Sequence, residues 1–354
     1  MWIETPIFQE DLNYAISVPF VPWEKMQGTT ILITGATGLI GFNLVSTLLY
    51  AELQKGLSLK ILALVRDEEK AKVRFRSVLG AGASLSFVVG DIEHIPSIEA
   101  PIDFIVHCGG PTASRYFVEF PVETIQENMM GATQLLELAR KKMVGGFLFL
   151  SSMEVYGGIH RKEKVSETHE SFIDTMAARS SYPEVKRMVE VMCASYFSEY
   201  NVPGKVIRLT QTFGPGVQRG DSRVFAQFLR SAMHGEDIVL HTEGRTERAY
   251  IYTMDAVTAI LTVLLKGRPG EAYNAANEKT YISIRDMAQL VANLSIHTTN
   301  GKKSRVMIDR QGKDVSLYLP ELYMDLDTKK LRALGWNAKW NLKEMFMRMY
   351  ATME

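Results

Sequence analysis

The stretch Thr34-Gly35-Ala36-Thr37-Gly38-Leu39-Ile40-Gly41 decides the fold of this chain of 354 residues. It follows the short apolar run Ile31-Leu32-Ile33 and precedes a helix-forming segment from Phe42 to Leu53. Its glycines have the spacing Gly-x-x-Gly-x-x-Gly, and a glycine-rich turn between a strand and a helix is typical of phosphate-binding βαβ units. The stretch therefore predicts a strand, a tight turn and the start of a helix.

Each glycine of this turn is needed for a different reason. Gly35 permits the tight turn, Gly38 lets a pyrophosphate approach the backbone, and Gly41 lets the helix pack closely on the strand. The first N–H groups of the helix and the positive end of its dipole then face the phosphates. We therefore expect a dinucleotide to bind at this turn.

Apolar runs further along the chain alternate with helical segments, which predicts an α/β fold with a doubly wound parallel sheet of the Rossmann type. The expected strands are Lys60–Val65, Leu85–Val89, Asp103–Val106 and Gly146–Leu150, and the longest expected helix runs from about Val122 to Lys142. Ligands of such sheets collect at the carboxyl ends of the strands. The residues expected along that edge are Gly35, Arg66, Asp91, Gly109 and Ser152.

The expected domain organisation has three parts. Residues 1–27 form an N-terminal extension, and residues 28–212 plus about 246–276 form the dinucleotide-binding domain. Residues 213–245 plus about 277–354 form a smaller C-terminal lobe for the substrate.

The composition is that of an ordinary globular enzyme, with 46% hydrophobic and 23% charged residues. Lys+Arg and Asp+Glu balance at 40 each, so no charge excess favours nucleic acid or an anionic membrane. No apolar run reaches the roughly 18 residues of a membrane span, and the first residues lack the basic cluster of a leader peptide. Cys108 and Cys193 lie far apart and are expected to be buried thiols in a reducing, cytoplasmic compartment. The seven histidines have no metal-binding spacing, so we expect no metal site.

Arg66 and Asp67 end the second expected strand, where such folds meet the adenosine ribose. An acidic residue there favours NAD, and an arginine favours the 2′-phosphate of NADP. The order of the two residues leaves both cofactors open, and a solvent-exposed charge pair without a role is equally consistent.

Tyr182-Pro183-Glu184-Val185-Lys186 carries the strongest chemical signal. Pro183 suits the first position of a helix, so a helix is expected to begin there. Tyr182 and Lys186 then lie on one face, where the ammonium is expected to lower the pKa of the phenol from its usual value near 10. With the Ser152 hydroxyl holding the substrate oxygen, this group can remove a proton from a carbinol while its hydride leaves for a nicotinamide.

These motifs together resemble the extended short-chain dehydrogenases/reductases that act on nucleotide sugars: epimerases, dehydratases and decarboxylases. The resemblance runs from about Thr29 to Trp340 and includes the glycine turn, the Asn128-x-x-Gly131 helix and the Gly335-Trp336 pair. It implies catalytic roles for Tyr182, Lys186, Ser152 and Glu154. It implies cofactor contacts from Gly35, Thr37, Gly38, Leu39, Ile40, Gly41, Arg66, Asp91, Ile92, Cys108, Gly109, Gly110, Asn128, Ser151, Tyr182 and Lys186. The implied cofactor is NAD, with NADP left open by Arg66.

The same resemblance implies a substrate site for a nucleotide sugar. Its expected residues are Thr112, Ser114, Gln211, Arg223, Val224, Leu240 and Arg248. Arginines suit a diphosphate because the guanidinium stays charged and binds phosphate oxygens in pairs. Relatives of this kind form homodimers through two helices, here at about 122–142 and 183–200.

Within the family, the segment Ser151-Ser152-Met153-Glu154-Val155-Tyr156-Gly157 is most similar to that of UDP-glucuronate decarboxylases, where Glu154 matches a catalytic glutamate. Dehydratases have an acid at the position of Met153, which cannot donate a proton. Three features differ from the decarboxylases: Gln211 replaces asparagine, Arg66 is unusual, and no arginine is found around Pro320 to Asp327. A 4-epimerase, an NADPH-dependent reductase and a non-catalytic NAD(P)-binding regulator remain the alternatives.

Overall fold

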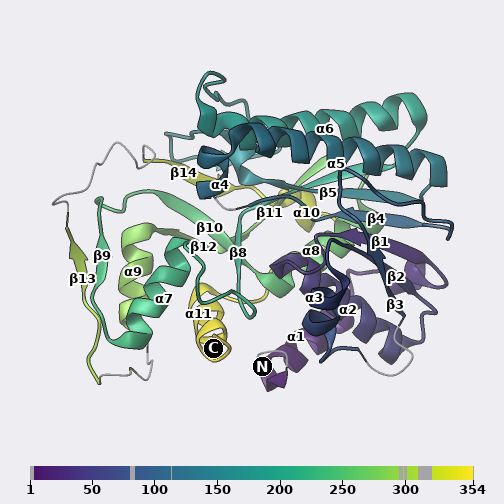
Figure 1. Ribbon diagram of the computed structural model, residues 1–354. Coiled ribbons are helices and arrows are strands. Elements are labelled where there is room, and N and C mark those ends of the chain that lie inside the picture. The colour runs from purple at the N-terminus through teal and green to yellow at the C-terminus, as the bar shows by residue number, and fades with distance from the viewer. Residues whose placement is uncertain are drawn as a thin grey trace.

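The computed structural model describes residues 4–79, 84–112, 114–294, 298, 301–309 and 321–353. Its centre is a seven-stranded sheet in the order β11-β7-β5-β4-β1-β2-β3, and every neighbouring pair runs parallel (Figure 1). The strands are β1 (Thr30–Thr34), β2 (Lys60–Val65), β3 (Leu85–Val89), β4 (Phe104–His107), β5 (Gly146–Ser152), β7 (Gly204–Leu209) and β11 (Ala272–Ala275). The predicted parallel Rossmann-type sheet is confirmed.

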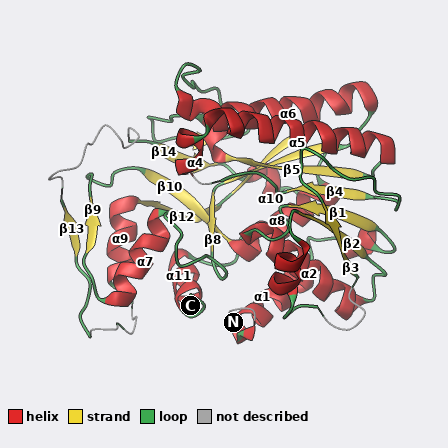
Figure 2. Ribbon diagram, viewed as in Figure 1, coloured by secondary structure: helices red, strands yellow, loops and turns green. Residues whose placement is uncertain are grey.

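Helices cover both faces of this sheet (Figure 2). The helices α1 (Pro6–Ser17), α2 (Leu39–Lys55) and α8 (Thr253–Lys266) lie on one face, and α5 (Pro121–Lys142) and α6 (Ser181–Tyr200) lie on the other. Successive residues of β1 supply both layers, because side chains alternate along a strand. Ile31 and Ile33 pack in the core with α2 and α8, whereas Leu32 packs with α5 and α6.

A second sheet lies beside the first, in the order β12-β10-β14-β6, and β8 pairs with β10. Its strands are β6 (Lys164–Val165), β8 (Gln211–Phe213), β10 (Glu247–Tyr252), β12 (Asn277–Ser283) and β14 (Tyr323–Leu326). The strands β9 (Ile238–Leu240) and β13 (Val306–Ile308) form a separate pair. The helices around them are α7 (Val224–His234), α9 (Ile284–Ala292), α10 (Lys329–Arg332) and α11 (Leu342–Tyr350).

The N-terminal helix α1 packs on α2 and α8 and is bonded to the C-terminal helix α11. Asp11 is buried, accepts a hydrogen bond from Arg348 at 2.7 Å and accepts another from the Tyr252 hydroxyl at 2.7 Å. Burial raises the pKa of Asp11 to about 6, and the Arg348 guanidinium opposes that rise. The extension thus joins the two ends of the chain, which lie near each other in Figure 1.

Two details differ from the sequence-based expectations. The helix α6 begins at Ser181, not at Pro183; proline is tolerated there because the first four N–H groups of a helix lack partners within the helix. Cys193 is buried as expected, but Cys108 is only partly buried, and both thiols are free. Within the described residues, no helix combines the length and apolar character needed to cross a membrane.

Candidate active site

At Gly35 and Gly41, contacts with neighbouring backbone exclude any larger residue from the turn. Gly35 has φ +62°, and a Cβ there would lie 2.7 Å from the Cys108 carbonyl oxygen at the end of β4. A Cβ on Gly41 would collide with the carbonyl oxygen of Gly35. The turn therefore brings the start of α2 close to the ends of β1 and β4, where a dinucleotide binds in folds of this kind.

The helix α2 begins with its N–H groups open. Its N-cap is Gly38, and no side chain caps the helix. Thr37 and Gly38 are exposed, whereas Leu39 and Ile40 are half-buried beside them. Uncapped N–H groups at the positive end of a buried helix fit a pyrophosphate, so the turn suits the expected cofactor.

The end of β4 contributes a buried polar group and further small residues. The Thr34 hydroxyl accepts a hydrogen bond from the Gly109 N–H at 3.1 Å and shares a second hydrogen bond of 2.8 Å with His107 Nδ1, whose direction depends on the tautomer of the ring. Burial lowers the pKa of His107 to about 3, which keeps the ring neutral. On α5, Asn128 is buried, and in the described part of the chain its Oδ1 has no hydrogen-bond partner. A Cβ on Gly110 would lie 3.2 Å from that oxygen, so backbone and amide meet closely here.

The segments that follow β2 and β3 present one arginine and two aspartates. Asp67 caps the helix α3 (Glu68–Phe75) by accepting from the Lys70 N–H at 3.0 Å, while Arg66 remains exposed. Asp91 accepts from the N–H groups of Glu93 and His94 at 2.9 and 2.7 Å, which lowers its pKa.

The residues that follow Asp91 serve the local structure of the loop after β3. Ile92 packs against α5, since a Cβ on Gly131 would lie 2.8 Å from the Ile92 side chain. Asp91, Glu93 and His94 bring three potential metal-ligand atoms within 4.8 Å of one another. The hydrogen bonds from the N–H groups of Glu93 and His94 to the Asp91 carboxylate already explain why these three side chains lie close together.

Tyr182 and Lys186 lie one turn apart at the start of α6, and both are buried, with 6% and 4% of their surface exposed. Lys186 Nζ donates to the Leu150 carbonyl at 3.1 Å and lies 4.5 Å from the centre of the Phe149 ring. It lies 5.6 Å from the centre of the Tyr182 ring. Burial lowers the pKa of Lys186 to about 8, opposed by the charge of Glu190, so the ammonium form prevails at neutral pH.

The expected lowering of the Tyr182 pKa is wrong for the protein without bound ligands. Burial raises the pKa of Tyr182 first, and the Glu154 carboxylate raises it further. A hydrogen bond with Ser152 and the charge of Arg179 act in the opposite direction. The ammonium of Lys186 is engaged with a backbone carbonyl, and desolvation of the phenol outweighs any help from it.

Ser152 and Glu154 lie beside this tyrosine. The strand β5 ends at Ser152, and the short helix η3 (Met153–Tyr156) follows, so that the Ser152 hydroxyl accepts from the Glu154 N–H at 3.2 Å. The Glu154 carboxylate accepts from Arg179 Nη2 at 2.6 Å. The ring of Phe117, on α4 (Ser114–Glu119), stacks on the Tyr182 ring with centres 4.0 Å apart.

Ser151 points away from this group and into a buried ion pair. Its hydroxyl donates to Glu190 Oε1 at 2.5 Å. Arg208 on β7 binds the same carboxylate through Nε and Nη2, and its Nη1 donates to the Tyr156 hydroxyl at 2.8 Å. The expected cofactor residue Ser151 therefore joins a network that holds β5, β7 and α6 together.

In the second sheet, three buried polar atoms lack partners among the described residues: Gln211 Oε1, Arg248 Nε and the Tyr250 hydroxyl. Gln211 on β8 pairs in register with Tyr250 on β10. Buried polar atoms are nearly always hydrogen-bonded, so such a group suits a polar ligand. Arg248 makes no ion pair in the described part of the chain and fits the expected role as a diphosphate ligand.

The other expected substrate residues are spread more widely. Arg223 is the N-cap of α7 and is ion-paired with Asp221, which also accepts from its Nε at 3.0 Å. Val224 begins α7, Leu240 is buried at the end of β9, and Thr112 is exposed. The side chain of Ser114 and the residue Pro320 lie outside the described part of the chain.

Arg179, Phe117 and the Glu190–Arg208 pair were not predicted from the sequence. Arg179 lies three residues before Tyr182 and therefore outside the helix that was expected to begin at Pro183. The helical pattern of that segment did not include it. Phe117 lies on a short helix without a clear pattern. The pairing of Glu190 with Arg208 depends on α6 packing against β5 and β7, which one sequence does not specify.

Comparison with known proteins gives the family. The model of the NAD dependent epimerase/dehydratase family matches residues 31–276, more than half of the chain. The chain belongs to this family. It is therefore an NAD-dependent enzyme of the extended short-chain dehydrogenase/reductase type, whose members modify nucleotide sugars.

Individual relatives are distant. The chain is 28% identical over 274 residues to UDP-glucuronic acid decarboxylase 1 of Xenopus tropicalis, covering 75% of this chain and 60% of that protein. It is 27% identical over 320 residues to UDP-glucuronic acid decarboxylase 5 of Arabidopsis thaliana, covering 89% and 86%. The fold is similar to that of dTDP-glucose 4,6-dehydratase from Bacillus anthracis in complex with NAD, with a TM-score of 0.72, 20% identity and coverage of 91% and 96%.

Proposed function

We propose that this enzyme acts on a nucleotide sugar through a 4-keto intermediate and resembles UDP-glucuronate decarboxylase in its reaction. The observation that carries the proposal is the position of Glu154, which follows Ser152 in η3, donates its N–H to the Ser152 hydroxyl at 3.2 Å and acts by its charge on the Tyr182 phenol. Met153, which precedes it, is 6% exposed and has no proton to donate for the elimination of water. The decarboxylases among the relatives support the same reaction.

In the proposed mechanism, Tyr182 removes the proton from O4 of the sugar, and Ser152 and Glu154 orient the ring. The turn Gly35–Gly41 would hold NAD, which would supply the hydride acceptor and a positive charge that favours deprotonation of a nearby acid. In a glucuronosyl substrate the C4 ketone is β to the C6 carboxylate. The C5–C6 bond then breaks, its electron pair enters the ketone, carbon dioxide leaves, and C5 takes up a proton. Return of the hydride to C4 then gives UDP-xylose with no net oxidation or reduction.

The test is an incubation of the purified enzyme with UDP-glucuronate and NAD. We expect carbon dioxide release with formation of UDP-xylose or its 4-keto precursor, measured by trapping of labelled carbon dioxide and by mass spectrometry. UDP-glucose serves as the control, because it has no carboxylate to lose. No carbon dioxide from an enzyme that binds UDP-glucuronate would rule out the decarboxylase.

A second candidate is an NADPH-dependent reductase of a nucleotide-sugar ketone. Its support is the end of β2, where Asp67 caps α3 and the exposed Arg66 is free to meet a 2′-phosphate. Net consumption of NADPH with such a ketone would favour this candidate, and the absence of net cofactor turnover would remove it. A thermal-shift screen of UDP-, dTDP-, CDP- and GDP-sugars with NAD and NADP identifies the base and the cofactor together.

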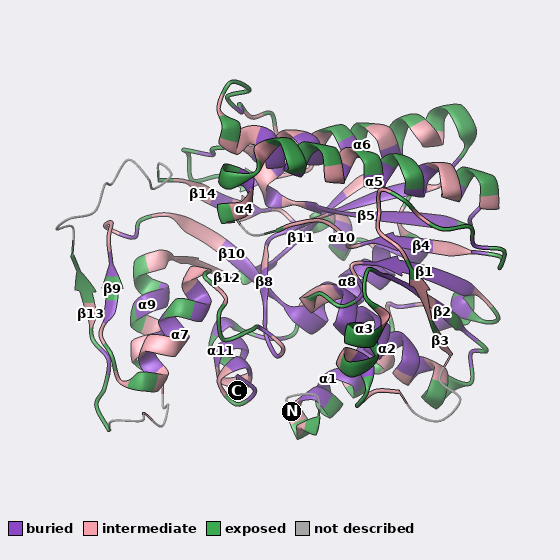
Figure 3. Cartoon of the chain, in the orientation of Figure 1, coloured by how far each residue is buried: buried purple, intermediate pink, exposed green. Residues whose placement is uncertain are grey.

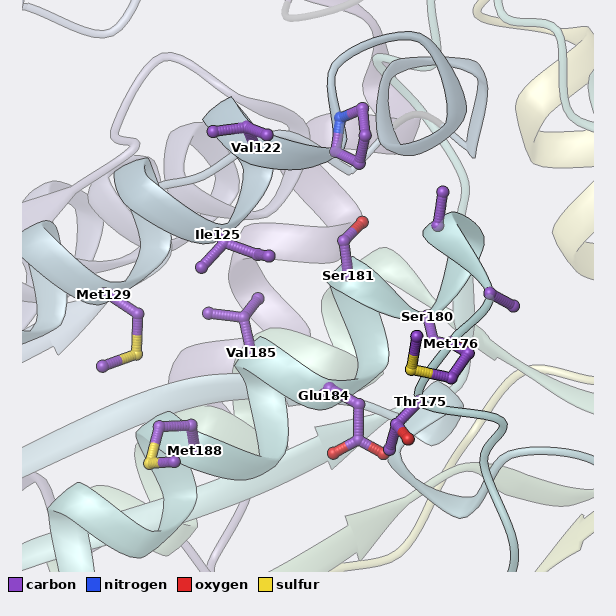
Figure 4. A pocket seen from close by; sticks show the side chains of 13 residues that line it. Val122, Ile125, Met129, Thr175, Met176, Ser180, Ser181, Glu184, Val185 and Met188 are labelled. Atoms are coloured by element: carbon purple, nitrogen blue, oxygen red, sulfur yellow. The ribbon is translucent and has the colours of Figure 1, made fainter.

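We also propose that the enzyme is a homodimer that joins α5 and α6 of two copies. The two helices border a groove of about 500 Å³ lined by Val122, Ile125, Val185 and Met188, with Met176 at its end (Figure 4). The outward face of this helix pair is exposed along its length in Figure 3. Its exposed apolar side chains, including Val122 and Met188, support burial against a second copy.

Charges placed on this face are expected to separate the dimer. In the double variant Val122→Glu with Met188→Glu, dimer formation would bury two unpaired carboxylates of each copy in the interface, which is unfavourable. We therefore expect light scattering to show a monomer. Leu53→Glu is the control, because it alters an exposed apolar residue on α2, away from α5 and α6. A wild-type monomer at micromolar concentration, or an intact dimer of the double variant, would contradict the proposal.

A cytoplasmic location is proposed from the state of the two cysteines. Cys108 and Cys193 are both free thiols, as expected for a reducing compartment. Thiol titration of the enzyme isolated under non-reducing conditions is expected to give two reactive groups after unfolding.

A further inference from the structure

The N-terminal helix α1 is fixed to the cofactor side of the molecule. It packs on α2 and α8. The Phe8 ring stacks against the Phe42 ring of α2, with centres 6.3 Å apart. The Tyr50 hydroxyl, also on α2, donates to Asn13 Oδ1 at 2.6 Å. Since the glycine turn leads directly into α2, the helix α1 is anchored next to the element that begins at the expected cofactor site.

On its other side α1 is bound to the C-terminal helix α11 through one guanidinium. Arg348 Nη2 donates to Asp11 Oδ1 at 2.7 Å and to the Ile7 carbonyl at 3.0 Å. Arg348 Nη1 donates to Glu10 at 3.0 Å. The side chains of Arg348 and Asp11 are 16% and 3% exposed, so water and salt screen this pair little. Both helices lie outside residues 31–276, the part of the chain that the family model matches.

The same guanidinium also holds the end of β10. Arg348 Nε donates to the Tyr252 hydroxyl at 3.0 Å, and that hydroxyl donates to Asp11 Oδ2 at 2.7 Å. The Tyr252 ring packs against the Trp340 ring, with centres 4.4 Å apart. The Trp340 ring in turn meets the Tyr14 ring of α1 at 4.6 Å. Tyr252 is therefore held by α1, by α11 and by the segment between α10 and α11.

The strand β10 carries two of the candidate substrate groups. Arg248 and Tyr250 precede Tyr252 by four and two residues, so the alternation of side chains along a strand places all three on one face. The Phe213 ring packs against the Tyr250 ring at 5.7 Å and against the Phe346 ring of α11 at 5.0 Å between centres. The helix α11 thus supports the face of β10 on which Arg248 Nε and the Tyr250 hydroxyl lack partners among the described residues.

We propose that α1 is a strap that, through Arg348, fixes α11 and the end of β10 relative to the dinucleotide-binding domain, and so preforms the site for the nucleotide part of the substrate. Arg348 and Asp11 are positioning residues, because they hold Tyr252 and act on the ligand only through β10. A site that is already ordered before binding avoids the entropic cost of ordering it. The inference rests on the proposed nucleotide-sugar site at Arg248 and does not depend on the reaction at the sugar.

The experiment measures NAD binding, and UDP binding to the NAD-loaded enzyme, by calorimetry for the wild-type chain and for Arg348→Met. We expect the affinity for UDP to fall by about threefold to thirtyfold, the range for coupling through packed elements, and the affinity for NAD to change by less than about twofold. Arg348→Lys keeps the charge without the planar fork of donors, so its affinity for UDP is expected to lie between the two. Amide hydrogen exchange of the NAD-loaded Arg348→Met variant is expected to be faster in β10 and unchanged in α5.

Arg332→Met is the matched control, because it removes a guanidinium of α10 that donates to Thr328 and Glu278. It should leave UDP binding unchanged. The double variant Asp11→Asn with Arg348→Met releases the strap without leaving a buried carboxylate unpaired, which protects the test against simple misfolding. It is expected to weaken UDP binding as much as Arg348→Met does.

A lower midpoint of thermal unfolding with unchanged binding of UDP and NAD would mean that Arg348 only stabilises the fold, and would overturn the inference. Equal weakening of UDP and NAD binding would also overturn it, as would a wild-type enzyme that does not bind UDP. Because UDP contains no sugar, the result is separate from that of the decarboxylase test. UDP binding that depends on Arg348, in an enzyme that releases no carbon dioxide, supports the strap and contradicts the decarboxylase. Carbon dioxide release with unchanged UDP binding in Arg348→Met has the opposite meaning.

Discussion

Tyr182→Phe is expected to lower turnover by about a hundredfold to ten-thousandfold, the usual contribution of a positioned acid or base. The ring is 6% exposed and stacks on Phe117 with its plane tilted by 7°, and phenylalanine preserves that packing. The change removes the hydroxyl alone. Binding of NAD and the midpoint of thermal unfolding are therefore expected to stay close to the wild-type values.

The measurement is single-turnover formation of the 4-keto product, with NAD binding followed in parallel. Tyr116→Phe is the matched control: Tyr116 lies on α4 next to Phe117, its hydroxyl donates to Glu127 at 2.9 Å, and no catalytic role is proposed for it. If Tyr182→Phe retained full turnover, the proposed base would be wrong. If wild-type enzyme bound NAD without converting any nucleotide sugar, the non-catalytic regulator would become the better interpretation.

The sequence was sufficient for the parts of this protein that depend on local pattern. The strand before Gly35, the helix after Gly41 and the alternation of apolar runs follow from periods of two and 3.6 residues, and the parallel sheet follows from them. The tight turn could also be predicted from its glycines, and the structure shows why they are needed: any Cβ at Gly35 or Gly41 would collide with backbone atoms.

The pKa shifts in the site could not be predicted from the sequence in the same way. The spacing of Tyr182 and Lys186 places them on one helix face, but the pKa of a phenol depends on burial and on every charge nearby. The chain brings Glu154 to Tyr182 from the end of β5 and turns Lys186 toward the Leu150 carbonyl. Neither arrangement can be predicted from the spacing of residues. The expected lowering of the Tyr182 pKa was therefore wrong.

Arg208→Met is expected to lower the free energy of unfolding by about 3–5 kcal/mol, because it leaves the Glu190 carboxylate buried without its partner. The side chains of Arg208 and Glu190 are 14% and 11% exposed. Arg208 also donates to the Tyr156 hydroxyl and to the Glu167 carbonyl, each at 2.8 Å, so one guanidinium joins β7, α6, η3 and the segment after β6. Denaturant unfolding at neutral pH measures the loss.

The double variant Arg208→Met with Glu190→Gln separates charge from packing. Glutamine retains an acceptor for the Ser151 hydroxyl and removes the uncompensated charge, so we expect the double variant to recover part of the lost stability. A double variant less stable than Arg208→Met would contradict the charge argument and would indicate that the lost contacts to Tyr156 and Glu167 dominate.

The Glu190 carboxylate also leads to a prediction for the pH dependence of kcat/KM. The pKa of Lys186 is lowered to about 8, so its ammonium is present below that pH and is lost as the pH rises through it. The charge of Glu190 opposes this lowering. The alkaline fall of kcat/KM is therefore expected near pH 8 in wild-type enzyme and at lower pH in Glu190→Gln. Glu184→Gln, which alters an acid on the same helix paired with Arg187, should leave the profile unchanged. An unshifted profile in Glu190→Gln would show that the alkaline fall belongs to another group.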